Sequence, residues 1–307
     1  MEKGRVLKST GSWYYIKNQK NEPVTCKIRG KLRTAGIKST NPVAVGDYVW
    51  FEYYENEKIG IIKEIEPRNN YIIRKSTKLS KQYHIIASNM DKAFLIITLS
   101  QPVTRTLFID RFLVTTEAYE IPTELIFNKM DLNTAEQDEK TDDLIKTYEK
   151  AGYQSMQLSA TTGLNLDIMK EKLKGKTSLL AGNSGVGKTT IINALDPYLN
   201  LKTASMSKFN TGKHTTTFSE MFELSFGGYV IDTPGIKGFG LIDMDKSEIY
   251  HFFPEIFSYA KKCKYHNCMH LNEPGCAVIE AVNQDKISES RYINYLSILE
   301  GKEDKYR

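Results

Sequence analysis

The sequence has no apolar run long enough to cross a membrane. Its longest runs, such as residues 93–99, suit a strand, whereas a spanning helix needs about 20 apolar residues. The first 15 residues also lack the apolar core of a signal peptide. Cysteine is scarce, with four in 307 residues, which excludes a small disulfide scaffold. We therefore expect a cytoplasmic protein with no membrane contact.

The chain as a whole also lacks a large excess of positive or negative charge. Lys and Arg number 42 and Asp and Glu 37, so the formal net charge is +5, too little on its own to indicate a nucleic-acid partner. The excess is nevertheless local, because residues 1–67 contain 12 basic and 8 acidic residues. Residues 17–38 hold Glu22 as their one acid and seven basic residues, namely Lys17, Lys20, Lys27, Arg29, Lys31, Arg33 and Lys38.

Hydrophobic residues make up 40% of the chain, which excludes a disordered protein, and 307 residues suit two or three domains.

Short β-prone segments with turns between them, at residues 13–16, 24–28, 47–54 and 58–65, suggest a small barrel. Five strands in about 67 residues would fit an OB-fold, which commonly binds nucleic acid. A charged barrel that contacts only the next domain fits the same pattern.

The middle of the chain alternates strand-like and helix-like segments, which predicts an α/β domain with a parallel-rich sheet and helices on both faces. The C-terminal part is expected to be mainly helical. We therefore divide this multi-domain chain into residues 1–67, 68–244 and 245–307.

A glycine-rich segment follows the predicted strand at residues 177–181 and precedes an apolar helix start, so it fits the phosphate-binding pattern G-x-x-x-x-G-K-[ST]. Lys188 would supply charge to the β- and γ-phosphates, and the Thr189 hydroxyl would ligate Mg²⁺. A glycine-rich turn without nucleotide is the alternative. The expected binding residues here are Gly182, Asn183, Ser184, Gly185, Val186, Gly187, Lys188, Thr189 and Thr190.

A second motif predicts guanine as the base. Asn128, Lys129, Met130 and Asp131 match N-K-x-D directly after a predicted strand. The Asp131 carboxylate would accept both N–H donors on one edge of guanine, an arrangement that adenine cannot satisfy. The later pair Ser159 and Ala160 matches a second guanine-contacting loop, in which the Ala160 amide would donate to guanine O6.

Two further segments resemble nucleotide switches. Asp232, at the end of a predicted strand, would hold the Mg²⁺ shell, and the Gly235 amide would sense the γ-phosphate. Upstream, Thr216 is the favoured Mg²⁺ ligand, with Thr215 and Thr217 as alternatives. A plain polar loop fits this upstream stretch as well.

The sequence has no glutamine at the position that usually orients the attacking water. Many GTPases have Gln after the second switch glycine, but here Ile236 stands there. Intrinsic hydrolysis should therefore be slow unless another group orients the water. His214 is a candidate catalytic residue, although it could equally be structural or face RNA.

The order of these motifs is unusual, because the guanine loops precede the phosphate loop and the switches. A circular permutation would preserve the site in space while moving the chain ends. It also connects the second switch directly to residues 245–307, so the C-terminal segment should respond to the nucleotide state.

Three of the four cysteines cluster near the C-terminus. Three thiols and one imidazole within 14 residues match tetrahedral Zn²⁺, while a disulfide with a free thiol, or unrelated buried cysteines, are alternatives. His266 competes as a ligand, and Cys26 is most simply a core residue. The expected ligands are Cys263, Cys268, His270 and Cys276.

Taken together, these motifs resemble the ribosome small-subunit-dependent GTPase A family of bacteria over nearly the whole chain. The resemblance implies an OB-fold, a circularly permuted GTPase domain and a zinc-binding domain, with one structural Zn²⁺ per chain and Mg²⁺ bound with GTP. It also implies hydrolysis of GTP to GDP and phosphate in late maturation of the 30S subunit. The partners would be GTP, GDP, the 30S subunit and its 16S rRNA, and the chain would be a monomer.

In this interpretation the GTP form binds the small subunit, and hydrolysis stimulated by the subunit drives release. The main alternative is a GTP-gated RNA-binding switch or chaperone in which hydrolysis is incidental, which Ile236 slightly favours. A GTPase of large-subunit or tRNA biology is a third hypothesis.

Overall fold

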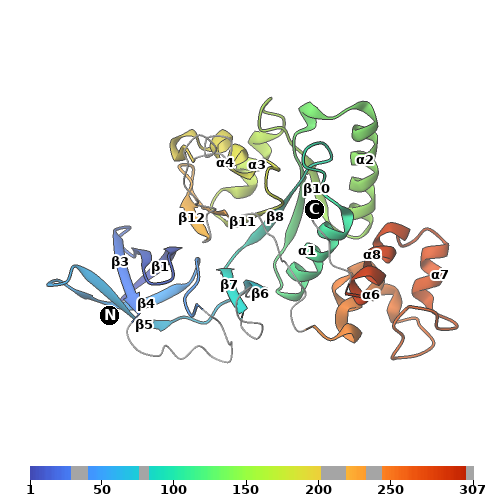
Figure 1. Cartoon of the computed structure of the whole chain (residues 1–307), viewed down its shortest axis with the longest axis horizontal. Helices are drawn as coiled ribbons and strands as arrows, with labels where there is room; N and C mark the ends of the chain where they lie inside the picture. The colour runs from blue at the N-terminus through green and yellow to red at the C-terminus, as the bar shows by residue number, and fades with distance from the viewer. Residues whose placement is uncertain (29–40, 76–82, 202–218, 233–243, 302–307) are drawn as a thin grey trace.

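The computed structural model describes residues 1–28, 41–75, 83–201, 219–232 and 244–301. Figure 1 shows three parts: a strand-rich part formed by the N-terminal residues, a central sheet with helices, and a helical C-terminal part on the far side of the centre. Within the described ranges, no helix combines the length and the apolar character needed to cross a membrane. The multi-domain α/β class predicted from the sequence is confirmed.

The N-terminal part is a closed five-stranded barrel. The strands follow the order β1-β2-β3-β5-β4, and β1 also pairs with β4 to close the ring, as in an OB-fold. Cys26 is fully buried in the barrel core, as predicted. The strands are β1 (Glu2–Ser9), β2 (Tyr14–Asn18), β3 (Pro23–Ile28), β4 (Tyr48–Tyr54) and β5 (Ile59–Ile65).

A two-stranded hairpin, β6 (Tyr71–Lys75) with β7 (Tyr83–Ser88), follows the barrel and leads into the central sheet. The central strands are β8 (Lys92–Ile97), β9 (Thr123–Phe127), β10 (Gln154–Gln157), β11 (Thr177–Ala181), β12 (Glu220–Glu223) and β13 (Tyr229–Asp232). β10, β9, β8, β11 and β13 are mutually parallel neighbours, whereas β12 runs antiparallel to β13.

Helices cover both faces of the central sheet because its buried strands alternate their apolar side chains between two cores. α1 and α2 pack on the face that carries Leu95 and Leu125. α3 and α4 pack on the face that carries Phe94 and Ile126. The helical elements are α1 (Thr106–Ala118), α2 (Ala135–Lys150), α3 (Leu166–Leu173) and α4 (Lys188–Leu195), with the 3₁₀ turns η1 (Met130–Leu132) and η2 (Pro197–Leu199).

The barrel and the central domain share one sheet. β1 pairs antiparallel with β12, with Lys8 opposite Glu220, so the eleven strands from β10 to β4 are continuous. The edge of β12 that faces away from β13 is therefore covered by the barrel.

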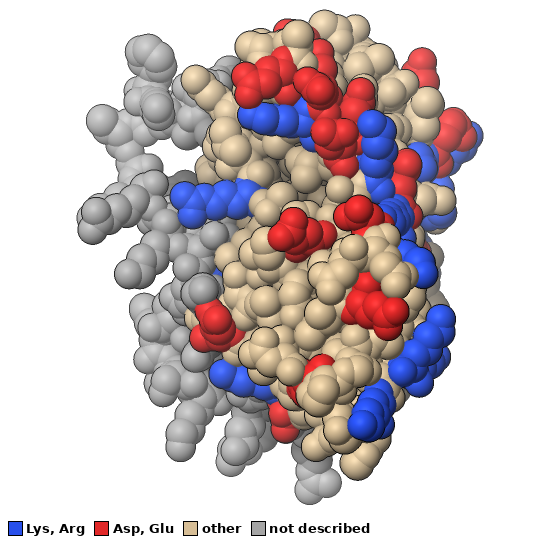
Figure 2. All heavy atoms as spheres, turned by 90° about the vertical axis from the view of Figure 1, so that its right-hand side faces the viewer, with Lys and Arg blue, Asp and Glu red and all other residues tan. Residues whose placement is uncertain are grey.

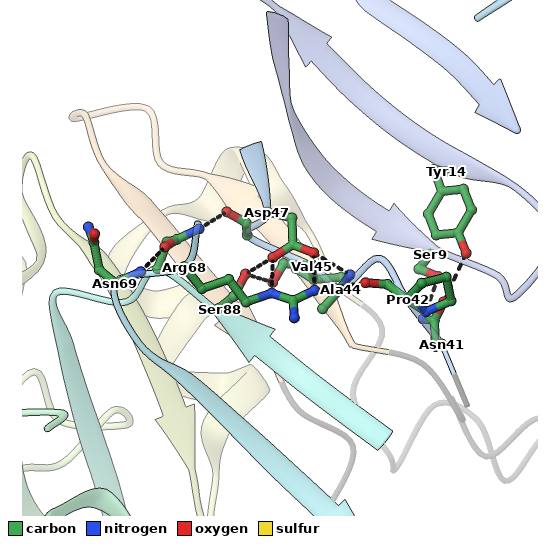
Figure 3. A network of polar contacts seen from close by, with 12 residues as sticks. Ser9, Tyr14, Asn41, Pro42, Ala44, Val45, Asp47, Arg68, Asn69 and Ser88 are labelled. Carbon is green, nitrogen blue, oxygen red and sulfur yellow. Dashed lines mark hydrogen bonds and ion pairs between the residues drawn. The ribbon is translucent and has the colours of Figure 1, made fainter. Parts of the chain in front are cut away.

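A buried polar network fixes the barrel to the segments that follow it (Figure 3). The fully buried Asp47 accepts hydrogen bonds from Arg68 Nε at 2.7 Å and Nη2 at 2.6 Å, and from Ser88 Oγ at 2.6 Å. Asn89 Nδ2 adds a bond to the Gly46 carbonyl at 3.1 Å. Because Ser88 ends β7 and Asn89 lies in the short turn between β7 and β8, the network anchors the barrel beside the start of a central strand.

The C-terminal part is mainly helical, as predicted, and packs on α1. Arg291 is buried and donates to Asp110 of α1 at 2.5 Å and to Glu255 at 2.7 Å. Asn294 donates to the other Asp110 oxygen at 2.6 Å. The helical elements of the C-terminal part are η3 (Lys246–Phe252), α6 (Pro254–Ala260), α7 (Ala277–Asn283) and α8 (Glu289–Leu299).

Replacement of Asp47 by Ala should destabilise the protein strongly, because it leaves the Arg68 guanidinium unpaired in a largely buried position. We expect a loss of about 3 kcal/mol, measured as a lower midpoint in urea unfolding. The control is Glu136→Ala, which breaks an exposed pair with Lys140 on α2 and should leave the midpoint unchanged. Equal midpoints for the two variants would contradict the anchoring role of Asp47.

Candidate nucleotide and metal sites

The predicted nucleotide motifs meet at one edge of the central sheet. β9, β11 and β13 are parallel members of the sheet, so their carboxyl ends lie at the same edge. Asn128 follows β9, Gly182 follows β11, and Asp232 is the last residue of β13. Ser159 follows the parallel strand β10 by two residues. Ligands of open α/β sheets bind at this edge, outside the carboxyl ends of the strands.

The glycines of the phosphate loop adopt backbone conformations that other residues rarely take. Gly182, Gly185 and Gly187 have φ values of 144°, 87° and 101°. A Cβ atom on Gly187 would lie 2.5 Å from Asn128 Nδ2, so only glycine allows the loop to approach the guanine motif so closely. α4 begins directly after Gly187 and directs its amino end toward the loop.

Lys188 lies beneath the phosphate loop and bonds to its backbone. Its side chain is buried, and Nζ donates to the carbonyls of Gly182 at 2.8 Å and Asn183 at 3.1 Å. Burial lowers the pKa of Lys188, and the nearby Asp232 opposes this shift. The ammonium group is thus held at the loop by weak acceptors that phosphate oxygens can replace.

Asn128 and Lys129 connect the guanine motif to the phosphate loop. Asn128 is buried and donates from Nδ2 to the Val186 carbonyl at 2.8 Å. Lys129 has a left-handed backbone (φ 67°), and its Nζ donates to the Gly185 carbonyl at 2.8 Å and to the Gln101 carbonyl at 2.5 Å. The Asn128 contact agrees with the prediction that this residue holds the binding loops together.

Asp131 lies beside the second guanine loop. Its Oδ1 accepts a hydrogen bond from Ser159 Oγ at 2.5 Å, and the Thr162 amide donates to the same hydroxyl at 3.1 Å. Ser159 is fully buried, whereas Asp131 is exposed. The serine therefore orients a carboxylate that remains open to a ligand. Together, these loops can present a bidentate acceptor to a guanine edge.

Asp232 has the environment expected of a ligand for a cation. Burial raises its pKa to about 6, Lys188 partly opposes the increase, and Glu220 adds to it. Its Oδ1 is buried and has no hydrogen-bond partner among the residues that the structure describes. A divalent cation bound beside the phosphates would satisfy this oxygen, so the residues fit Mg²⁺.

Several predicted residues lie outside the described parts of the chain, and their roles stay predictions. These are His214, Thr215, Thr216, Thr217, Gly235 and Ile236, together with Arg29, Lys31, Arg33 and Lys38. The remaining members of the nucleotide motifs lie at the same sheet edge: Ser184 in the phosphate loop, Thr189 and Thr190 in the first turn of α4, Met130 in η1, and Ala160 after Ser159.

The segment that joins β8 to α1 contacts the nucleotide loops, although no sequence motif predicts it as part of the site. The Gln101 carbonyl of this segment accepts the Lys129 bond, and Pro102 Cδ would lie 3.5 Å from a Cβ on Gly185. Gln137 of α2 donates to the Leu99 carbonyl at 3.0 Å. The only feature of this segment that stands out in the sequence is Ser-Gln-Pro at residues 100–102, after an apolar strand. This tripeptide indicates a turn and does not indicate nucleotide binding.

The cysteine cluster forms a compact group of ligands. The ligand atoms of all four residues lie within 4.8 Å of one another, and three of the residues are buried. His270 Nδ1 lies 3.6 Å from Cys263 Sγ and 3.5 Å from Cys276 Sγ, and the two sulfurs are 3.9 Å apart. Tetrahedral Zn²⁺ with bonds of about 2.3 Å to sulfur requires separations close to these. The group comprises Cys263, Cys268, His270 and Cys276, so His266 is not a member.

Surrounding residues hold this loop in shape. Glu273 accepts hydrogen bonds from the backbone amides of Met269 and Leu271, both at 2.7 Å. From α8, Tyr292 donates to the His270 carbonyl and Tyr295 to the Met269 carbonyl, each at 2.7 Å. The ligand loop is thus fixed from outside the cluster, as in structural metal sites.

Comparison with known proteins agrees with this geometry. A sequence model described as RsgA GTPase matches residues 65–242, and one described as RsgA N-terminal domain matches residues 3–62. The chain belongs to the RsgA GTPase family. The family confirms that the protein is a GTP-hydrolysing enzyme.

Relatives of RsgA type match over their full lengths. A protein of Christiangramia forsetii named small ribosomal subunit biogenesis GTPase RsgA is 54% identical, with 99% of this chain and 98% of the relative covered. A protein of the same name from Phocaeicola vulgatus is 53% identical, with 99% of both chains covered.

Two solved structures share the fold. The crystal structure of YjeQ from Thermotoga maritima has a TM-score of 0.79 and 33% identity, and it covers 98% of each chain. YloQ, described as a circularly permuted GTPase, has a TM-score of 0.72 and 28% identity, covering 99% of this chain and 96% of its own. The predicted permutation is therefore confirmed.

Replacing Asp131 by Asn should change the base that this RsgA member binds. Loss of the charged acceptor should weaken GTP binding by about 10- to 100-fold and favour xanthosine triphosphate, whose base presents a carbonyl where guanine has an amino group. Titration with fluorescent nucleotides measures both affinities. The exposed α2 variant Asp142→Asn is the control, and GTP affinity unchanged by Asp131→Asn would refute the assignment of this loop.

Proposed function

We propose that this protein hydrolyses GTP as a late assembly factor of the small ribosomal subunit. The observation that carries the proposal is the direct contact between an N-K-x-D loop and a phosphate loop at one sheet edge, through Asn128 and Val186. The name shared by full-length relatives, small ribosomal subunit biogenesis GTPase, supports the assignment to this process.

The site residues divide into base and phosphate groups. Asp131 receives the guanine N–H donors, and the Ala160 amide donates to O6. The aliphatic part of Lys129 covers the base. The phosphate-loop amides and Lys188 bind the β- and γ-phosphates, and the Mg²⁺ ion is held through Thr189, Thr216 and Asp232. When bound, this ion neutralises charge on the phosphate oxygens.

Hydrolysis is assigned to the switch segments. The Gly235 amide senses the γ-phosphate, and His214 is the candidate that orients the attacking water. Ile236 has no hydrogen-bonding group for that task, so the protein alone should turn over slowly. We propose that the GTP form binds the 30S subunit, that the subunit stimulates hydrolysis, and that hydrolysis releases the protein.

The barrel is the proposed contact to 16S rRNA. Lys27 Nζ lies 3.8 Å from the centre of the Trp13 ring, and Tyr15 on β2 is 45% exposed, so cationic and aromatic groups adjoin on the outer barrel. The side of the molecule shown in Figure 2 differs, because acidic side chains gather at its top and much of its lower part is uncharged. This contrast favours the barrel over that side as the surface for phosphates.

We extend the proposal to the oligomeric state, the location and the functional units of the protein. The protein works as a monomer in the cytoplasm, where assembling subunits are found. Its functional units are the barrel at residues 1–67, the permuted GTPase domain at 68–244 and the metal-binding domain at 245–307.

The decisive test is GTP turnover by the purified protein with and without isolated 30S subunits. We expect stimulation of at least about tenfold, because Ile236 cannot orient the attacking water and the protein alone should therefore turn over slowly. The 50S subunit is the control and should have little effect. Equal turnover in all three conditions would refute subunit-stimulated hydrolysis.

A GTP-gated RNA chaperone is the second candidate, and the observation that favours it is again Ile236. In that case a His214→Ala variant that hydrolyses no GTP would still support 30S maturation.

We also propose that the Cys₃His cluster binds one structural Zn²⁺. Three thiolates and one imidazole form a closed tetrahedral set that leaves no open position for chemistry. Burial raises the pKa of the Cys268 thiol to about 12, so this thiol is protonated without a cation, and binding of zinc would release its proton.

Metal analysis tests this assignment. The purified protein should contain about one zinc per chain, and Cys276→Ser should reduce this content and lower the midpoint of thermal unfolding. Cys26→Ser changes a cysteine far from the cluster and should retain the metal. A metal content that is the same in the Cys276 variant and the unaltered protein would contradict the site.

A further inference from the structure

The hairpin of β12 and β13 links the two proposed switches. β12 follows the segment that contains Thr216, and β13 ends at Asp232. Within the hairpin, Glu220 is paired directly with Asp232. Any displacement of β12 therefore moves the backbone that carries the proposed magnesium ligand.

The outer edge of this hairpin is held by the barrel. Lys8 of β1 is the register partner of Glu220, so Lys8, Glu220 and Asp232 lie in one row across three strands. Lys8 Nζ contacts both carboxylate oxygens of Glu220, at 2.9 and 3.0 Å. A second pair joins Lys17 of β2 to Glu223 at the other end of β12, at 2.5 Å.

A stacked arginine adds a third contact. The Arg5 guanidinium lies 5.1 Å from the ring centres of both Tyr48 in the barrel and Tyr229 in β13. Its Nη2 donates to the Asn89 carbonyl at 3.2 Å, next to the start of β8. The hairpin, the barrel and the central sheet therefore meet at one side chain.

The barrel itself is a firm support for these contacts, because Asp47 anchors it through Arg68 and Ser88. The Lys8–Glu220 and Lys17–Glu223 pairs are more exposed to solvent than the Asp47–Arg68 pair. The side chains of Lys8 and Glu220 are 41% and 30% exposed, and those of Lys17 and Glu223 are 15% and 49% exposed. Ion pairs open to solvent contribute little to stability, and each of these pairs is open to solvent on its Glu220 or Glu223 side. The pairs on β12 can therefore be broken and re-formed without unfolding the protein.

We propose that the Lys8–Glu220 and Lys17–Glu223 pairs are positioning contacts through which the barrel controls the β12–β13 hairpin, and so couple RNA on the barrel to the nucleotide site. Lys17 is part of the basic N-terminal segment, and an RNA phosphate near β2 competes with Glu223 for its ammonium group. The coupling acts in both directions, so the nucleotide state also changes the affinity of the barrel for RNA. This inference rests on the proposed function in small-subunit assembly.

Charge reversal separates coupling from RNA binding. Glu223→Lys breaks the pair but adds positive charge, so it should bind 30S subunits at least as tightly as the unaltered protein. We expect its subunit-stimulated kcat to fall by about five- to tenfold with unchanged basal turnover. Combining Lys17→Glu with Glu223→Lys restores the ion pair with its two charges exchanged between the strands. This double variant should return the stimulated kcat to within about twofold of that of the unaltered protein.

The matched control is Glu52→Lys, which breaks the exposed barrel pair with Lys63, away from the hairpin. It should be stimulated normally. Full stimulation of Glu223→Lys would overturn the inference. Failure of the double reversal to restore kcat would also overturn it, because an ammonium–carboxylate pair between these two positions would then not carry the coupling.

A second readout needs no ribosome and so separates this inference from the proposed function. Hydrogen exchange of strand β2 should differ between the protein bound to a non-hydrolysable GTP analogue and the protein bound to GDP. Glu223→Lys should abolish the difference, and the double reversal should restore it. Identical exchange in the two nucleotide states of the unaltered protein would overturn the coupling, whatever the 30S subunit does to turnover.

Discussion

The rest of the structure depends on one constraint: parallel strands that neighbour one another in a sheet end at the same edge. β10, β9, β8, β11 and β13 obey it, and the nucleotide motifs within the described part of the chain lie where these strands end at this edge. The position of a motif along the chain is therefore irrelevant, provided that its strand keeps its place in the sheet. This explains how Asn128 contacts Val186 although the guanine motif precedes the phosphate loop.

The permutation changes what is attached to the site. In this chain the barrel precedes the first central strand and covers the outer edge of β12, while the C-terminal domain follows the second switch and packs on α1. Each outer domain is fixed by a buried ion pair, Asp47 with Arg68 in one case and Asp110 with Arg291 in the other. Buried pairs give little net stability but penalise every arrangement that leaves a charge unpaired. Their role here is to define how the domains are oriented.

Local patterns were sufficient to predict much of the site. The phosphate loop, the N-K-x-D loop and the Cys₃His cluster each occupy a short stretch, and their chemistry restricts which residues can appear there. The barrel and the central βα alternation were also predictable from strand and helix periodicity. The placement of His270 rather than His266 was left open by spacing and required the folded loop, which Tyr292 and Glu273 hold.

The contacts between domains were not predictable, because both partners are ordinary charged residues far apart in the sequence. β1 was missed since Lys and Arg interrupt its apolar pattern, and only its buried positions, such as Val6, show that it is a strand. The sequence places Lys17 in a basic segment suited to RNA, and nothing in the sequence indicates that its ammonium group also contacts Glu223, 206 residues away. Arg291 gave no signal in the sequence, although it is the largest fully buried side chain among the described residues.

The account rests on the claim that the strand ends assemble one guanine-nucleotide site. Displacement of fluorescent GDP from the unaltered protein by GTP and by ATP, in the presence of Mg²⁺, tests this claim most directly. The account predicts that GTP competes at least about 100-fold better than ATP, because adenine leaves the Asp131 carboxylate without its donors. Equal competition by the two nucleotides would contradict it.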